Sequence, residues 1–146
     1  MFFGGKIDLS KVFPSQPSAQ GPEPLPNNND ERLLAAIAHL LPMVGPLVPP
    51  HFWIFGIVPP LVFWQLKRGQ SAFLCAVGLE VLNFQIWVVG LLTMASVLRH
   101  LPLIGGVLAV VIPLAIISAL VLMMMAALEC KQGRFVRYPW VQRIVK

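Results

Sequence analysis

The sequence predicts an all-α integral membrane protein with three to four transmembrane or half-inserted helices, kinked by prolines. Of its 146 residues, 57% are hydrophobic and only 12% are charged, and the mean hydropathy is +0.76. A soluble domain carries about 25% charged residues, so a globular core cannot absorb this much apolar surface. The apolar residues also fall into long runs, and a spanning helix needs about 20 of them. Helices satisfy their own backbone groups, as hydrocarbon requires.

The composition divides the chain into three regions. Residues 1–30 are rich in proline and asparagine, cannot build a helix face or a core, and are predicted to be a disordered tail. Residues 31–130 are predicted to form the helical membrane domain. Residues 131–146 are predicted to form a basic, aromatic juxtamembrane tail.

The first apolar stretch, residues 33–66, contains no Asp, Glu, Lys or Arg. It is too long for one straight span and short for two. Prolines remove a helical hydrogen bond and clash with the preceding turn, so the cluster from Pro42 to Pro50 must break the run, and Pro59-Pro60 must kink or divide it. Two layouts stay open: a tight helical hairpin, or a half-inserted first helix followed by one kinked span.

Two further apolar runs follow the basic turn at residues 67–71. A helix is expected from about Ala72 to Leu98, and the last span from about Leu103 to Leu128. The last span holds two pairs of small residues four apart, a spacing that permits close helix approach. These pairs are Gly105 with Ala109, and Ala115 with Ala119.

The Lys and Arg residues predict the orientation, because cytoplasmic segments carry an excess of them. Either layout places the turn at Lys67-Arg68 and the C-terminal tail in the cytoplasm. With four membrane segments the N-terminus lies there too, and only Arg99 lies opposite. We therefore expect a multi-pass protein of the cell (inner or plasma) membrane, with a cytoplasmic C-terminus and an N-terminus on the same side.

The apolar body contains a few polar residues, and these are the candidate intramembrane site. Glu80 and Asn83 share a helix face with Trp87, since they step by three or four. Gln85 points elsewhere, and His39 lies in the first apolar stretch. Ionisable residues in a membrane suggest function, but Glu80 at the start of a span could also cap it at headgroup level, facing the basic turn. Both interpretations stay open.

The net charge of +5 is placed just outside the apolar runs. A nucleic-acid interface needs a basic stripe on a polar surface, so no nucleic-acid partner is expected. The partner predicted instead is the lipid bilayer, with Tyr138-Pro139-Trp140 as a short anchor among arginines. The predicted lipid-headgroup contacts are Lys67, Arg68, Lys131, Arg134, Arg137 and Arg143.

No catalytic or metal-binding pattern is present. The serines have no histidine base at a recognisable spacing, and no glycine-rich phosphate loop exists. His39 and His51 have no second ligand four residues on, and Cys75 and Cys130 form no metal or redox spacing. We expect no enzyme activity, no metal and no cofactor.

Several short elements together resemble a bacterial family of small membrane proteins, domain-of-unknown-function family 4870. They are residues 34–40, Phe63-Trp64 before the basic turn, residues 80–85 and residues 133–139. That family is more distantly similar to the four-helix Tic20-type components of the chloroplast inner-envelope import machinery. The resemblance covers about residues 31–139 and implies an architecture more than an activity. It departs at residues 73–79, which are wholly apolar here.

These observations predict a non-enzymatic scaffold or accessory subunit of a membrane complex, related to protein translocation if the resemblance holds. Its expected partners are another membrane protein or further copies of the chain. The alternative is a small oligomeric channel or carrier, in which Glu80, Asn83, Gln85 and His39 line a polar path. One subunit of this size encloses little, so a channel would require several.

Overall fold

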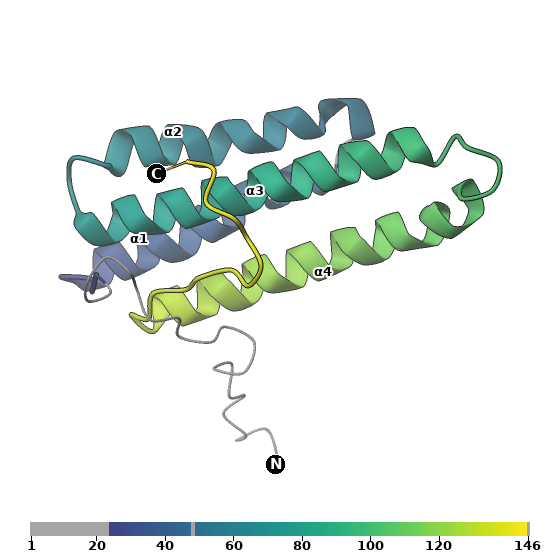
Figure 1. The fold of residues 1–146 in the computed structure, drawn as a ribbon. Coiled ribbons are helices and arrows are strands. Elements are labelled where there is room, and N and C mark those ends of the chain that lie inside the picture. Colours follow the sequence, from purple (N-terminus) through teal and green to yellow (C-terminus); the bar gives the residue numbers. More distant parts are fainter. Residues whose placement is uncertain (1–23, 48, 146) are drawn as a thin grey trace, which may run out of the picture.

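The computed structural model describes residues 24–47 and 49–145, and every regular element in them is helical. Four helical rods lie side by side, each antiparallel to the next along the chain (Figure 1). The first rod is α1 (Asn29–Leu40) followed by the 3₁₀ segment η2 (Leu41–Leu47), and the second is η3 (Pro50–Ile57) followed by α2 (Val58–Lys67). The third and fourth rods are α3 (Ala72–Leu98) and α4 (Gly105–Lys131).

Local capping chemistry fixes the start of α1. The Asn28 side chain accepts a hydrogen bond from the Glu31 amide at 2.8 Å, and the Glu31 carboxylate accepts one in return from the Asn27 amide at 2.9 Å. This reciprocal arrangement satisfies amides that have no partner within the helix. The hydrogen bond from the Asn27 backbone also lowers the pKa of Glu31.

Prolines determine how the first two rods are built. Pro42 and Pro46 fall where α1 gives way to η2, because the α-helical hydrogen-bond pattern cannot continue through them. Pro59 and Pro60 stand in the first turn of α2, where a missing amide costs nothing. The first apolar stretch is therefore a helical hairpin, one of the two layouts that the sequence left open.

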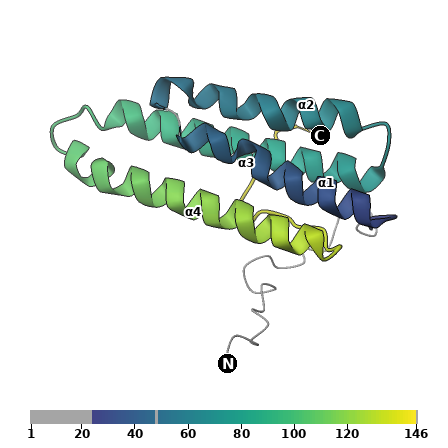
Figure 2. The same ribbon diagram turned by 180° about the vertical axis from the view of Figure 1, so that it is seen from behind.

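Helix α3 is the centre of the bundle. Ser71 caps it by accepting a hydrogen bond from the Leu74 amide at 3.3 Å, and the helix then continues unbroken for 27 residues, over the range predicted from the sequence. It packs against α1, α2 with η3, and α4. Seen from behind, α1 crosses in front of α3, between α2 and α4 (Figure 2). The larger hydrophobic core, which includes Val77, Val81 and Met123, lies among these helices.

Helix α4 ends at a left-handed glycine. Gly133 has φ of +84°, a conformation that costs glycine little, and the chain turns back there along α4. The N-terminal end of α1, the turn at residues 67–71 and the C-terminal end of α4 all lie at one end of the bundle, and the turn at residues 99–104 lies at the other (Figure 1). The four-segment layout requires this grouping, and which end faces the cytoplasm stays a prediction.

The all-helical fold is thus confirmed for the residues described, and α3 and α4 are each long and apolar enough to cross a membrane. The disordered tail predicted for residues 1–30 lies outside the described residues up to residue 23. The side chain of His51 lies outside them as well.

Candidate functional site

The C-terminal segment, residues 132–145, folds back onto the bundle and forms side-chain hydrogen bonds and ion pairs with its helices. We call it the C-terminal strap. It leaves the end of α4, runs back beside that helix and then crosses α3 on the side away from α1 (Figures 1 and 2). It contains no helix or strand, so its backbone groups need other partners, and side chains of α3 supply several of them.

Asn83 is the main anchor of the strap. Its Oδ1 accepts hydrogen bonds from the amides of Ile144 at 2.9 Å and Val145 at 2.8 Å. Its Nδ2 donates to the carbonyl of Val145 at 3.0 Å and to that of Leu79, in its own helix, at 2.9 Å. The carboxamide thus uses its two donors and its acceptor, at a residue only 1% exposed. One turn further along α3, Trp87 Nε1 donates to the Gln142 carbonyl at 3.1 Å.

The two buried carboxylates of the bundle each pair with an arginine of the strap. Glu80, on the same face of α3 as Asn83, accepts hydrogen bonds from Arg143 Nε at 3.1 Å and Nη2 at 2.8 Å. Glu129, near the end of α4, pairs with Arg134 through both carboxylate oxygens. Burying a carboxylate is costly unless it is paired, so these arginines make the buried positions tolerable.

Tyr138 joins the strap to the first helix. Its ring stacks on Phe84 of α3, with centroids 3.9 Å apart and an interplanar angle of 14°. Its hydroxyl and His39 Nδ1 form a hydrogen bond of 2.7 Å. Tyr138 therefore reaches across the bundle, since the strap and α1 lie on opposite sides of α3. Burial raises the pKa of Tyr138 well above its ordinary value.

Gln85 lies on another side of α3, toward the η2–η3 hairpin. A Cβ on Gly56 would lie 2.6 Å from Gln85 Nε2, and one on Gly45 would lie 2.9 Å from the Gly56 Cα. The two glycines therefore allow η2, η3 and the Gln85 amide to meet. Gln85 is fully buried, and within the described residues neither of its amide atoms has a hydrogen-bond partner.

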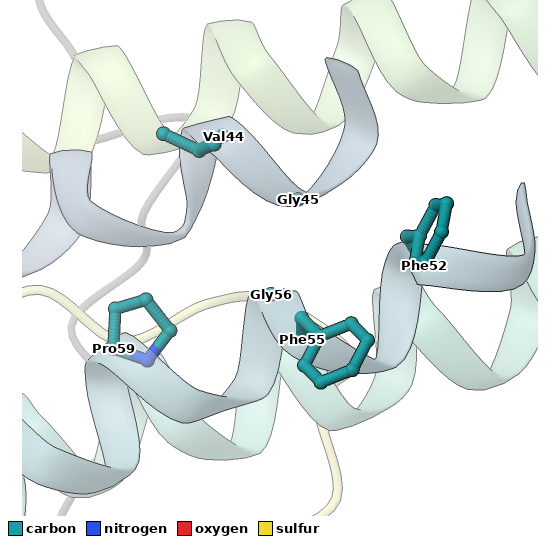
Figure 3. A pocket seen from close by; sticks show the side chains of 6 residues that line it. All are labelled: Val44, Gly45, Phe52, Phe55, Gly56 and Pro59. Carbon is teal, nitrogen blue, oxygen red and sulfur yellow. The ribbon is translucent and has the colours of Figure 1, made fainter. Parts of the chain in front are cut away.

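A small apolar pocket opens on the outer side of this hairpin. Its volume is about 270 Å³, and it lies between η2 and η3 (Figure 3). Its lining residues are Val44, Gly45, Phe52, Phe55, Gly56 and Pro59. The side chains of this lining offer no hydrogen-bond donor or acceptor.

The structure places the four predicted intramembrane residues in two groups. Glu80, Asn83 and His39 all face the strap or its Tyr138, whereas Gln85 faces the hairpin. They do not line one common path. In the part of the chain that the structure describes, no three His, Cys, Asp or Glu side chains lie together as they would to hold a metal ion.

The predicted headgroup residues are mostly at the end of the bundle where the helix termini gather. Lys67 donates to Gln70 Oε1 at 3.0 Å, and the Arg68 guanidinium lies 5.6 Å from the centroid of the Trp64 ring. Lys131 is exposed, and the Arg137 guanidinium lies over Phe135. Arg134 and Arg143 have protein partners in the two glutamates. Contact of any of the six with lipid stays a prediction.

The sequence analysis did not predict that the C-terminal strap is the partner of Glu80 and Asn83 on α3. Tyr138 and the strap backbone complete the site, and no local pattern marks them as ligands of a helix. One signal was available: the apolar body has two carboxylates, Glu80 and Glu129, and the tail that follows has three arginines and no acidic residue. Complementary charges of this kind suggest pairing.

These features define a class of protein. Four antiparallel helical rods expose many large apolar side chains on their outer surface, and Glu80 and Asn83 of the central helix find their partners inside the chain itself. An apolar exterior around internally paired polar groups is typical of a small helical membrane protein.

The chain belongs to the MamF/MmsF family, described as a magnetosome magnetite crystal formation protein family, which it matches over residues 30–145. The expected membership of domain-of-unknown-function family 4870, with its likeness to Tic20-type import components, is therefore wrong. The short elements behind that resemblance specify a membrane architecture and are too few to distinguish families. No curated protein and no solved structure matches the chain.

Proposed function

We propose that this chain is a non-enzymatic structural subunit of the magnetosome membrane that acts in the formation of magnetite crystals. The observation that carries the proposal is the family match, which covers the whole helical bundle and the strap. The family description names crystal formation and no chemical reaction. Protein translocation has no support, since it rested on the other resemblance.

The bonding of the buried carboxylates supports a structural role over transport. A carrier or channel for iron needs carboxylate or other oxygen ligands free to meet the ion. Glu80 and Glu129 each hold an arginine of the strap instead. Glu80 and Asn83, the strongest candidates for a polar path, hold the strap against α3. The oligomeric channel is accordingly the less favoured alternative.

The strap also supports a structural role, because it connects three helices of the bundle. It ties α1, α3 and α4 together through His39, Asn83 and Glu129. A bundle tied together in this way presents a fixed surface. We propose that this fixed surface organises other components at the membrane where the crystal grows.

The proposal is tested in magnetite-forming cells that lack this chain and are complemented with variants. Wild type is expected to be recovered in purified magnetosome membranes and to restore crystal size and shape, measured by electron microscopy. Glu80→Arg, which removes the strap's ion pair, is expected to give altered crystals. The matched control is the double variant Glu80→Arg/Arg143→Glu, which restores opposite charges and is expected to restore the crystals.

Two results would contradict the proposal. The first is a chain that fractionates with other membranes and leaves the crystals unchanged when absent. The second is iron uptake into vesicles that contain only the purified chain and that Glu80→Gln abolishes, because a scaffold moves no ions.

A further inference from the structure

Gln85 differs from Asn83, the other amide residue of α3, in its bonding. Its side chain is fully buried, and within the described residues neither its Oε1 nor its Nε2 has a hydrogen-bond partner. Asn83, two residues earlier in the same helix, bonds through both ends of its carboxamide. A buried carboxamide without partners is costly, and groups of this kind often mark a site for a molecule from outside the chain.

The depth of Gln85 in the membrane limits where its partner can come from. Helix α3 has 27 residues, and crossing the hydrocarbon takes about 20 of them. Every stretch of about that length within 72–98 includes residues 79–91. Gln85 therefore lies at hydrocarbon depth wherever along α3 the bilayer is placed, and hydrocarbon satisfies no amide group. This step rests on the membrane location of the chain and not on its role in crystal formation.

The apolar pocket between η2 and η3 adjoins this carboxamide. Gly45 and Gly56 line the pocket, and both also approach Gln85: a Cβ on Gly45 would lie 3.0 Å from Gln85 Nε2, and one on Gly56 would lie 2.6 Å from it. Figure 3 shows the two glycines facing each other across the gap between the segments. Because glycine has no side chain, one layer of backbone separates the carboxamide from the pocket.

The two segments that form this layer are suited to move apart. The 3₁₀ helix η2 has seven residues and η3 has eight, although 3₁₀ runs longer than about three to four residues are uncommon, because their hydrogen-bond geometry is poor. Such stretches within a longer helix often mark a hinge. A small separation of η2 from η3 at the glycines joins the pocket and the carboxamide of Gln85 into one cavity.

The chemistry of this cavity defines its ligand. Three apolar side chains of the lining are open to the outside of the bundle, since Val44 is 63%, Phe52 46% and Phe55 61% exposed, so a ligand enters from the lipid. The lining has no charged residue, and a buried charge without a partner is costly, which excludes a charged headgroup. Gln85 offers an acceptor oxygen and a donor NH₂ group.

We propose that the pocket binds a single-chain lipid whose uncharged end both donates and accepts a hydrogen bond, and that Gln85 binds this end. A hydroxyl group and an undissociated carboxyl group both have this chemistry. The volume of about 270 Å³ is near the lower limit for small-molecule pockets, about 300 Å³, so it suits one hydrocarbon chain and not a two-chain lipid.

The test is photolabelling of the purified chain in phosphatidylcholine vesicles. The probes are decanol, decanoic acid at acidic pH and decane, each with a diazirine in its chain, and the labelled residues are found by peptide mass spectrometry. Decanol or decanoic acid is expected to label Phe52 or Phe55 saturably, and the probe that does so identifies the end group. Decane is expected to label outward residues of the bundle without saturation.

A variant tests the part that Gln85 plays. Gln85→Met keeps the length of the side chain and removes the carboxamide, so it is expected to lower the affinity for the saturating probe roughly tenfold, as the loss of one hydrogen bond does. The matched control is Gln65→Met, at an exposed position of α2, which is expected to leave the affinity unchanged. In vesicles without probe, Gln85→Met is expected to unfold at the same temperature as the wild type or at a higher one, because it removes an unpaired polar group.

Four results overturn the inference: no saturable labelling of the pocket, saturable labelling by decane as strong as that by the other probes, an unchanged affinity in Gln85→Met, or unfolding of Gln85→Met at a lower temperature than the wild type. The last result would mean that the carboxamide has a partner within the chain. All four leave the proposed role in crystal formation intact, because that role is tested by the crystals of complemented cells.

Discussion

Helices α3 and α4 have the same length, 27 residues, and both are strongly apolar, yet they occupy opposite roles in the bundle. Twelve residues of α3 are buried and only seven of α4, so α3 is the helix on which the others pack. Most of the outward side of α4 consists of exposed large side chains such as Val110 and Leu114.

Their polar residues differ in the same way. Within the body of α4, the Ser118 hydroxyl donates only to the Leu114 carbonyl of its own helix, at 2.8 Å. On α3, Glu80 and Asn83 bind a segment about 60 residues away in sequence. The role of a polar residue in an apolar helix thus depends on which group it binds. On α3 that partner is the chain's own C-terminus, which makes a transport role unnecessary to explain these residues.

The largest expected effect contrasts one leucine on each helix. Leu82 on α3 is 2% exposed and Leu114 on α4 is 57% exposed. Leu82→Ala is expected to lower the free energy of unfolding by about 2–5 kcal/mol, because it opens a cavity in packed surroundings. Leu114→Ala is expected to change it by less than about 0.5 kcal/mol. Denaturation in detergent micelles followed by circular dichroism measures both, and equal effects would refute the central role of α3.

The second-largest effect is expected when Asn83, the anchor of the strap, is replaced. Asn83→Leu keeps the size of the side chain but leaves the amides of Ile144 and Val145 without an acceptor. We expect the docking of the strap to weaken by about 3 kcal/mol, since unsatisfied buried amides cost about 1–3 kcal/mol each. Hydrogen exchange of residues 138–145 is expected to accelerate roughly a hundredfold, as 1.4 kcal/mol corresponds to a factor of ten.

The matched control for this change is Ser118→Ala on α4. It removes a hydrogen bond within one turn of a helix, so exchange in the strap is expected to stay as in the wild type. Acceleration in both variants would mean that the strap responds to general loosening of the bundle and not to the loss of Asn83.

The sequence was sufficient to predict the helical class and the limits of α3. Apolar runs, the basic turn at residues 67–71 and the prolines act over a few residues, and all of these signals are local. It also placed Glu80, Asn83 and Trp87 on one face. The hairpin of the first two rods stayed one of two options, because what favours it is the close contact of Gly45 with Gly56, eleven residues apart.

The partner of that face could not be predicted in the same way. Asn83 forms its hydrogen bonds with backbone groups of residues 144–145. Every residue has such groups, so the side chains of residues 144–145 give no sign that they bind Asn83. The approach of His39 to Tyr138 joins residues 99 apart in sequence and depends on the packing of three helices. Side-chain periodicity reports which face a residue is on, but not what covers that face.

A smaller effect tests the ion pair that crosses from the strap to α3. Glu80→Arg and Arg143→Glu each place like charges together and are expected to weaken strap docking by about 1–2 kcal/mol, discounted because the Arg143 side chain is 39% exposed. The double variant is expected to recover most of the loss. Limited proteolysis after Arg137 and at residue 143 measures docking, and Arg99→Glu at the far turn is the charge control.

Additive damage in the double variant would show that the two side chains act independently. The geometry, with two nitrogens of Arg143 directed at one oxygen of Glu80, predicts coupling between them instead.

The smallest effect concerns the titration of Tyr138, the only tyrosine in the chain. Burial raises its pKa in the docked strap, so the docked state favours the protonated form. The contribution of Tyr138 to docking is therefore complete below pH 10, the ordinary pKa of tyrosine, and is lost as the pH rises further toward the raised value. In detergent, tyrosinate absorbance of the wild type is expected to appear only well above pH 10, while Asn83→Leu, with its strap less firmly docked, is expected to titrate at a lower pH than the wild type.

Tyr138→Phe separates the hydroxyl from the ring. It keeps the stack on Phe84 and loses the hydrogen bond to His39, so docking is expected to weaken by about 1 kcal/mol and its alkaline dependence to disappear. Helix α4 contributes no group to this bond, so Leu114→Ala is expected to leave the titration unchanged. Identical titration curves for the wild type and Asn83→Leu would mean that Asn83 does not hold Tyr138 in place, and the distinction drawn between α3 and α4 would then rest on apolar packing alone.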